Sequence, residues 1–531
     1  MEHSNPRDAD AVGGNRSSKS QLLVLGMLLT VLAVVFAAYT FPNWHNAKLE
    51  KEAGDAYSSF MAAVAKADAM ADPLQRCLSY PDLPGSHWNA DTTRAYCMLR
   101  NHQTIRLAEI EALLKQGKAG EVDRVFQGYL DTQRHDPQQP GLLDIAFLNA
   151  GFDDASDHAR RVIDMWKQQS PDSAFAFGAS GVQYVDAAQQ ARGGGWSRDL
   201  TDGQVDDMNQ QLALAFKDLN HAVSLDASIT AIYPSMIHAS GLNGDDRYMY
   251  RSVEMGLDAD PSNFSIRLQM MHHAQPRWGE NFGGVDEQSR EDTLLSSKNP
   301  LLRMVAQRRA VYRATCDCGD TQAQTERLVL QAADKNLTAS DMVDLAGKVY
   351  DSDRRLAVEL YSEALRFGPK DDVDALRWRS QEMIALGDRA GAMASFAAVA
   401  RRFPDDDAIA TQLGNIYAQA GDAKDAETTL LAVLARDPHN YDAMGVLGDL
   451  YNHAGHQPQK AESLADAMIS EHPEKAGGYI VRSCNQMDHN LPGVYDTIHY
   501  FIDRFGDDPQ WKTQTAEMRG YLIKHPEKVG V

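Results

Sequence analysis

The segment LGNIYAQAGDAKDAETTLLAVLARDP, Leu413–Pro438, carries apolar and small residues at helical spacing on both sides of a central Gly421-Asp422 pair. Apolar side chains that recur every three or four residues predict an amphipathic helix. Glycine supplies the turn between two such helices. Proline ends the second one, because it has no backbone N–H to donate and clashes with the preceding turn. The segment therefore predicts two short helices folded into a hairpin.

This pattern recurs through the last third of the chain. Pro369, Pro404, Pro438 and Pro473 follow one another at intervals of 35, 34 and 35 residues, and RRFPDD at 401–406 is echoed by DRFGDD at 503–508. A period of about 34 residues with two helices per unit is typical of a repeat whose units bury their apolar faces on one another. The sequence predicts an all-α solenoid of four or five hairpins over residues 339–510.

The unit resembles the tetratricopeptide repeat residue by residue. Leu413, Gly414 and Tyr417 take the large, small and large places of the first helix, and Ala426 takes the small place of the second. Gly347 falls at the place of Gly414 in the first unit. Small residues at these places let two helices approach closely, and the bulky ones fill the layers between hairpins.

The resemblance also implies a concave groove lined by first-helix residues. Asn415 occupies the family's shared asparagine place, but Thr411 stands where a carboxylate-clamping member has lysine. The groove is therefore expected to bind a protein segment of another type, or a carbohydrate, unless its residues are only solvated. The predicted groove residues are Arg377, Gln381, Asn415, Gln419, Asp449, Asn452 and Tyr479.

The N-terminal region differs in kind from the rest. Residues 1–20 are polar and predicted to be disordered, whereas residues 21–41, QLLVLGMLLTVLAVVFAAYTF, carry no charge. Twenty-one residues at about 1.5 Å per residue span roughly 30 Å, the thickness of a bilayer core. Lysine and arginine slightly favour the N-terminal side, which predicts a cytoplasmic N-terminus. The alternative, a cleaved signal peptide, has a shorter apolar run and a small-x-small cleavage site.

Residues 43–330 are predicted to be helical, with hairpins like those of the repeats. ARGGGWSRDL at 191–200 and PRWGENFGG at 276–284 resemble the signature stretches of a bacterial domain family of unknown function. Arg192, Trp196, Arg277 and Trp278 are the candidate site of this region. Either they meet a partner at a groove edge, or the tryptophans are buried knobs and the glycines form turns.

Five cysteines are present. Cys77 and Cys97 flank a loop-like stretch and are the disulfide candidate, whereas Cys316 and Cys318 are too close for an unstrained bridge to each other. A zinc site needs about four ligands, and no second closely spaced pair accompanies Cys316 and Cys318, so no metal is expected. The adjacent His272 and His273 have no partner at metal-binding spacing.

No catalytic motif stands out, and no cofactor is predicted. The chain lacks a G-x-S-x-G elbow and a phosphate-binding loop with its lysine. A formal net charge of −22, from 74 acidic and 52 basic residues, disfavours nucleic acid as a partner.

Together these features predict a non-enzymatic scaffold in the bacterial cell envelope that binds proteins. It is anchored in the inner membrane by a single helix, and its bulk is periplasmic. Residues 511–531 form a C-terminal helix or tail. The alternative is an envelope enzyme that hydrolyses wall or glycan material, with its site in residues 180–290. An acid–base pair converging beside Trp278 would distinguish the enzyme from the scaffold.

Overall fold

The computed structural model describes residues 54–136, 139–195, 200–316, 318–368, 372–401, 403–453 and 457–527. The chain divides into two units, Met1–Ala63 and Val64–Val531. Of the first unit only the helical residues 54–63 are described. The predicted anchor at residues 21–41 lies outside the described residues. Within the described ranges, no helix has the length and apolar character needed to cross a bilayer.

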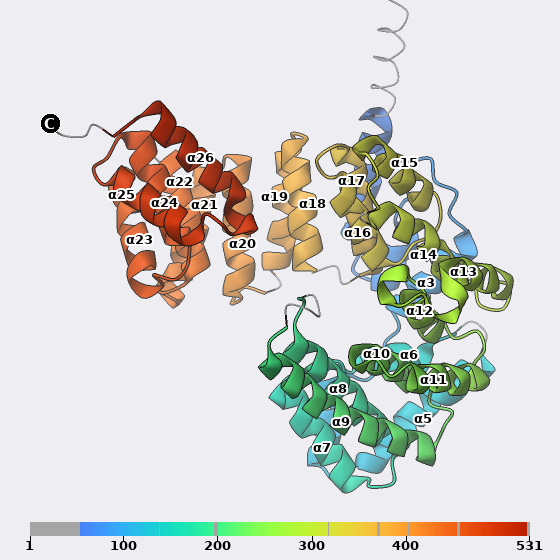
Figure 1. Ribbon diagram of the computed structural model, residues 1–531. Coiled ribbons are helices and arrows are strands. Elements are labelled where there is room, and N and C mark those ends of the chain that lie inside the picture. The colour runs from blue at the N-terminus through green and yellow to red at the C-terminus, as the bar shows by residue number, and fades with distance from the viewer. Residues whose placement is uncertain are drawn as a thin grey trace, which may run out of the picture. The chain divides into compact units, whose positions relative to one another are not determined.

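The described part of the second unit is helical and contains no strand, which confirms the all-α prediction (Figure 1). The helices before the repeats are α2 (Pro73–Ser79), α3 (Ala90–Arg100), α4 (Leu107–Lys115), α5 (Ala119–His135), α6 (Leu142–Asn149), α7 (Asp157–Gln169), α8 (Ala174–Arg192), α9 (Asp202–Leu225), α10 (Tyr233–Asn243), α11 (Asp246–Ala259), α12 (Phe264–His273), α13 (Gly284–Leu295), α14 (Leu302–Thr315) and α15 (Gln322–Ala333). Short 3-10 helices are η2 (Thr230–Ile232), η3 (Pro276–Trp278) and η4 (Asn281–Gly283).

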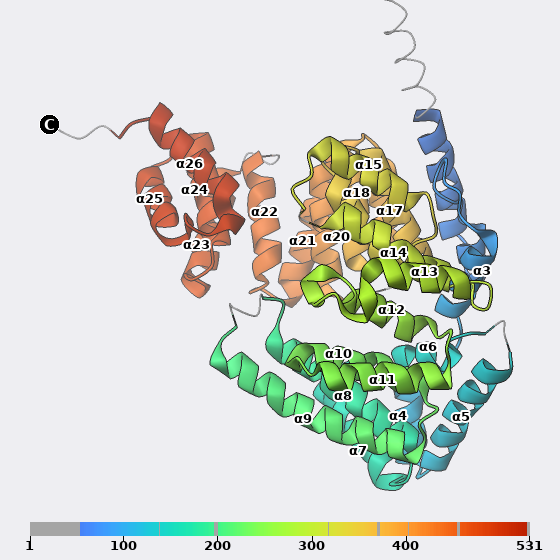
Figure 2. The same cartoon turned by 45° about the vertical axis from the view of Figure 1, so that its right-hand side comes forward.

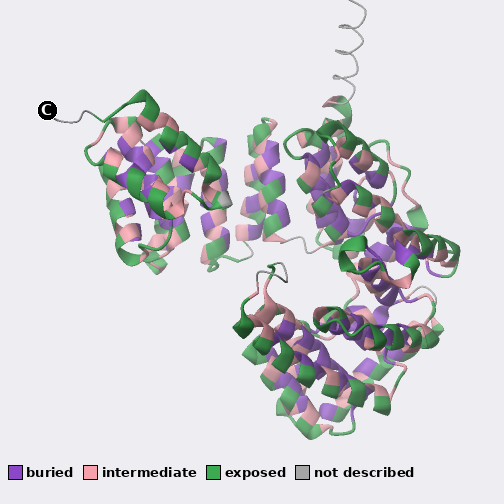
Figure 3. Ribbon diagram, viewed as in Figure 1, coloured by how far each residue is buried: buried purple, intermediate pink, exposed green. Residues whose placement is uncertain are grey.

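The repeat segment consists of successive antiparallel pairs. Its helices are α16 (Ala339–Val349), α17 (Arg354–Phe367), α18 (Val373–Ala385), α19 (Arg389–Ala400), α20 (Asp407–Ala420), α21 (Ala423–Arg436), α22 (Tyr441–His453), α23 (Pro458–Glu471), α24 (Gly477–His489) and α25 (Val494–Phe505), followed by η5 (Pro509–Trp511) and α26 (Lys512–Lys524). Each helix packs on the next along the chain. Buried residues concentrate along the facing sides of the pairs (Figure 3).

Helices α20 and α21 form the hairpin predicted from residues 413–438. The Asp406 side chain caps the start of α20 by accepting from the Ile409 N–H at 2.9 Å. Gly421 ends α20 at φ +84°, in the left-handed region that glycine tolerates best. A Cβ on Gly414 would lie 2.6 Å from Leu430 Cγ, and Ala426 is fully buried. The predicted close approach of the two helices at small residues is confirmed.

The hydrophobic core is continuous across the boundary predicted between residues 330 and 339. One cluster joins Cys77 and Cys97 of α2 and α3 to Val329 of α15, and to Leu345 and Leu360 of the first repeat. The helices from α4 to α12 share a second, larger cluster. α8 and α9 lie side by side in both views (Figures 1 and 2). Packing therefore does not separate the first repeat from the helices before it.

Cys77 and Cys97 form a disulfide, the pairing that the sequence offered as a candidate. Both residues are fully buried, and their Cα atoms are 5.7 Å apart. Cys316 and Cys318 are also bonded to each other, a pairing that the sequence did not favour. The backbone becomes extended at Cys316, after α14 ends, and the two Cα atoms are 5.3 Å apart, within the ordinary range for a bridge.

Candidate functional site

Five of the seven predicted groove residues are accessible, and they lie on the first helices of three successive repeats. Arg377 and Gln381 are partly exposed on α18, Asn415 is partly exposed and Gln419 exposed on α20, and Asp449 is exposed on α22. The Gln419 side chain donates to Asn415 Oδ1 at 3.2 Å. These side chains form a polar ridge, defined as Arg377, Gln381, Asn415, Gln419 and Asp449.

Arg377 is the cation of this polar ridge. Its guanidinium donates to Asp374 Oδ1 at 3.1 Å and lies 4.8 Å from the centre of the Trp378 ring. Trp378 is 41% exposed, although it is a large aromatic residue. An accessible tryptophan beside an arginine combines the two residue types that contribute most often to protein interfaces.

The other two predicted groove residues serve packing between helices. Asn452 is 2% exposed and donates to the Val481 carbonyl at 3.1 Å. Tyr479 is 7% exposed, and its ring stacks on that of Tyr500 at 4.6 Å between centroids. The sequence placed both by register alone, whereas Asn452 is turned onto α24 and Tyr479 packs against α25.

Trp278 is not a buried knob. It ends η3 and is 43% exposed. Its ring centre lies 4.9 Å from the imidazole of His272 and 5.7 Å from the guanidinium carbon of Arg277. The interpretation of Trp278 as a buried knob is therefore wrong. Trp196 lies outside the described residues.

The loop after Trp278 is held in a strained conformation. Glu280 and Phe282 have φ values of +54° and +56°, where residues other than glycine are uncommon. The Phe282 ring packs on Tyr250 at 4.8 Å, and its carbonyl accepts from Gln288 Nε2 at 2.7 Å. Strain of this kind persists only where tertiary contacts impose it, and it clusters at functional surfaces.

The two motif stretches lie in one electrostatic environment around α10 and α12. Burial lowers the pKa of His272 to about 3 and that of His273 to about 4, assisted by neighbouring imidazoles. Burial likewise lowers the pKa of His238, and the charge of Arg192 adds to this effect. These imidazoles are therefore neutral at pH 7. Among the described residues no group of three His, Cys, Asp or Glu side chains is placed to hold a metal ion.

Arg192 is engaged by its own loop. Its Nη1 donates to the carbonyl oxygens of Gly193 and Gly195, each at 3.0 Å. Both bonds are local, so the arginine closes the end of α8 and fixes the start of the glycine-rich turn. Of the three predicted motif residues that the structure describes, Arg277 and Trp278 are exposed and Arg192 is partly buried.

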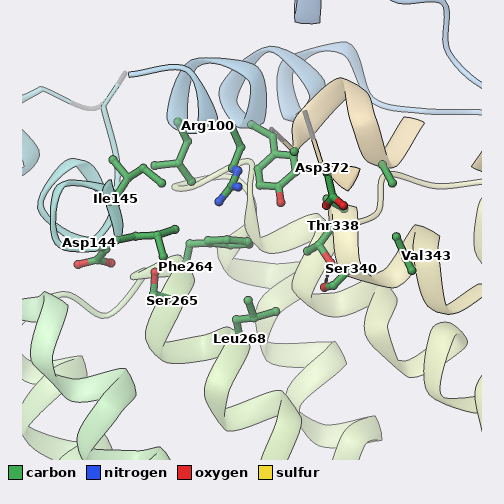
Figure 4. Close-up of a pocket in the computed structure, with 17 residues that line it drawn as sticks. Arg100, Asp144, Ile145, Phe264, Ser265, Leu268, Thr338, Ser340, Val343 and Asp372 are labelled. Carbon is green, nitrogen blue, oxygen red and sulfur yellow. Dashed lines mark hydrogen bonds between the residues drawn. The ribbon is translucent and has the colours of Figure 1, made fainter. Parts of the chain in front are cut away.

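A pocket of about 440 Å³ was not predicted from the sequence. Its walls come from α3, α6, α12, α16, Ala364 of α17, Gly368 and Asp372, and Phe264 and Leu268 form part of its apolar lining. Figure 4 shows the Arg100 guanidinium directed toward the space above Phe264, with Asp144 and Asp372 on opposite sides. Arg100 Nε donates to the Phe367 carbonyl at 3.0 Å.

Asp144 is fixed at the edge of this pocket. Its two carboxylate oxygens accept from Thr230 Oγ1 at 2.8 Å and from Asn263 Nδ2 at 2.9 Å. Burial raises the pKa of Asp144 despite these hydrogen bonds. The pocket residues are up to about 270 positions apart in sequence, and no short motif connects them. Sequence reasoning had no signal for the pocket.

The comparisons identify the repeats. Residues 383–437 match the tetratricopeptide repeat family, so the chain contains tetratricopeptide repeats. No curated protein sequence matches the chain. The part that matches the family contains most of the α18–α21 segment, including the hairpin from which the fold was predicted.

The comparison with solved structures finds matches of low TM-score. The P58(IPK) TPR domain is 13% identical, with 60% of this chain and 96% of that chain covered and a TM-score of 0.20. The APC/C hetero-tetramer Cut9-Hcn1 is 11% identical, with 84% of this chain and 76% of that chain covered and a TM-score of 0.32. Naa15/Naa10 bound to HypK-THB is 11% identical, with 90% of this chain and 93% of that chain covered and a TM-score of 0.27. At these TM-scores the assignment depends on the repeat hairpins and the family match.

Proposed function

We propose that this chain is a membrane-anchored tetratricopeptide scaffold that binds a protein partner along the polar ridge. The observation that carries the proposal is the ridge itself, because its side chains project from the first helices of three consecutive hairpins and most of their polar atoms bind no other helix. Trp378 beside Arg377 supplies an aromatic anchor. An interface needs such an anchor within a polar surround.

The cellular location belongs to the same proposal. Residues 21–41 anchor the chain in the inner membrane of a bacterium with the N-terminus in the cytoplasm, and residues 43–531 lie in the periplasm. The Cys77–Cys97 bridge supports this side of the membrane, since disulfides persist in oxidising compartments. A reporter that is active only outside the cytoplasm, fused after Val531, tests the orientation. Activity is expected, and a reporter active only inside the cell would overturn the location.

The interaction is tested by capture from envelope extracts with the full chain. We expect a triple variant, Arg377→Ala, Asn415→Ala and Asp449→Ala, to capture at least tenfold less of a partner that the wild type retains. The matched control changes exposed second-helix residues of the same repeats, Arg389→Ala, Lys424→Ala and Gln459→Ala, and should retain it. Equal retention by both triple variants would reject the ridge as the binding surface.

The hydrolase that the sequence left as the alternative requires an acid and a base converging beside Trp278. The Trp278 ring instead contacts the imidazole of His272 and the guanidinium of Arg277. A neutral, partly buried imidazole and a permanently charged guanidinium do not form such a pair. The geometry therefore favours the scaffold.

A further inference from the structure

A second cavity, of about 290 Å³, lies between residues 64–69 and helices α17, α18 and α19. Its charged lining is Asp68, Arg76 and Arg379. The rest is aliphatic or small: Ala65, Ala69, Leu365, Leu376, Ala394, Ser395, Ala398 and Val399. A cavity that combines buried cations with aliphatic walls has the two features of a site for a small amphipathic anion.

Arg76 and Asp68 are already paired. Arg76 donates to Asp68 Oδ1 through Nε at 3.0 Å and Nη2 at 2.8 Å, and through Nη1 to the Leu365 carbonyl at 3.0 Å. Asp68 Oδ1 also accepts from Tyr80 at 2.7 Å. The charges of these two side chains neutralise each other, and all three nitrogens of the Arg76 guanidinium donate hydrogen bonds within the protein.

Arg379 is the surplus cation. It is 2% exposed, and its Nε and Nη1 have no hydrogen-bond partner among the described residues. Its nearest acid is Asp68, whose Oδ2 is 3.6 Å from Arg379 Nη1, too far for a hydrogen bond. A buried charge whose N–H groups lack hydrogen-bond partners costs free energy, so its retention calls for an explanation, and a bound anion is one.

The cavity is separate from the polar ridge. Arg379 follows Arg377 by two residues on α18, so the two side chains leave the helix about 200° apart. Arg377 is partly exposed, whereas Arg379 is buried and lines the cavity. One helix thus presents one arginine on each side, and the second arginine serves no contact that the proposed function requires.

We propose that this cavity binds a small organic monoanion, an aliphatic carboxylate of about four to six carbons including the carboxyl carbon. The carboxylate accepts from the free guanidinium edge of Arg379, and this charge-assisted pairing neutralises the one surplus charge. The aliphatic body lies against the leucine, valine and alanine walls. The volume is near the lower end of the roughly 300–1,000 Å³ typical of ligand pockets, which favours a small ligand. Asp68 disfavours a dianion such as phosphate by repulsion.

The test is calorimetric titration of the detergent-purified full chain with butyrate, valerate and hexanoate. Butanol is the neutral analogue, and inorganic phosphate is the other anion. We expect carboxylate binding that Arg379→Gln weakens at least tenfold and that Arg377→Gln, the matched control on the same helix, leaves unchanged. Ala394→Leu fills the cavity without altering a charge and should weaken binding to a similar extent.

Three results would overturn the proposal: butanol binding as well as butyrate, phosphate binding more tightly than any carboxylate, or Arg379→Gln retaining wild-type affinity. If Arg379→Gln does not fold, Ala394→Leu decides, because unchanged affinity in that variant places the ligand elsewhere. Partner capture by the Arg377, Asn415 and Asp449 triple variant is scored separately. Failure of the carboxylate site and failure of the scaffold proposal are therefore distinguishable.

Discussion

Helices α8 and α21 show two ways of burying a helix in this protein. α21 buries one stripe, Ala426, Leu430 and Val433, at intervals of four and three residues. α8 buries residues on every side, including consecutive ones such as Phe175 and Ala176. Repeat helices pack on their neighbours in the sequence, so the spacing of their apolar residues predicts both the helix and its partner. α8 lies inside a core shared by many helices, so its apolar residues indicate that it is buried but not which helices it contacts.

The largest predicted difference between the two regions concerns core truncation. Phe126 is fully buried, and its ring contacts those of Tyr129, Phe147, Phe152, Trp166 and Phe175. Phe126→Ala should destabilise the α4–α12 region by about 3–5 kcal/mol, because it removes packing and leaves a cavity. Denaturant unfolding monitored by tryptophan fluorescence measures this. A loss below about 1 kcal/mol would mean that the region is not a single packed core.

The disulfide should have the next largest effect. Cys77 and Cys97 close a loop with a sequence separation of 20, and the double change Cys77→Ala and Cys97→Ala should cost about 3 kcal/mol by loop entropy. Unfolding of the wild type with and without a reductant provides the comparison. A reductant that destabilises the double variant as much as the wild type would assign the effect to the bridge at Cys316–Cys318.

Two glycines sharpen the comparison within the repeats. Gly414→Ala should cost about 1–3 kcal/mol, because the new Cβ would lie 2.6 Å from Leu430 Cγ. Gly347 takes the same place in the repeat pattern, yet among the described residues no atom beyond its chain neighbours and its own helix backbone lies within 4 Å of the position of its Cβ. Gly347→Ala should therefore stabilise α16 by about 0.5–1 kcal/mol. Thermal unfolding of both variants checks this. A change in stability of the same sign in the two variants would contradict the prediction.

A pH dependence of stability is expected from α17. Burial raises the pKa of Glu363 to about 8, although Arg366 Nη1 lies 3.1 Å from its carboxylate. The folded state then holds a proton that the unfolded chain releases near pH 4.5, so the stability contribution is complete below pH 4.5 and is lost as pH rises to 8. Glu363→Gln mimics the protonated acid and should flatten the dependence of unfolding free energy on pH between pH 5 and 8. Unfolding at a series of pH values measures it, and an unchanged slope would place the titration elsewhere.

The repeat register was predictable, but the exposure of each side chain was not. Glycine, small residues and proline at fixed intervals predicted the hairpins, because their backbone requirements are local. The same register assigned Asn452 and Tyr479 to an open groove, but the structure buries both side chains. It also gave Gly347 and Gly414 equivalent places, although the two glycines have different neighbours. Small departures in how one hairpin packs on the next change which side of a helix faces solvent.

The sequence by itself determined the helical class, the period of about 34 residues and the hairpin between Leu413 and Pro438, since these follow from side-chain periodicity and turn chemistry within a short span. Only the tertiary structure decided that Trp278 is exposed on a strained loop, that Arg100 and Asp144 border one pocket, and that Arg379 is buried without hydrogen-bond partners. Each of these depends on segments far apart in the chain. Their contacts are selected by the free energy of the whole packed core, which no local pattern records.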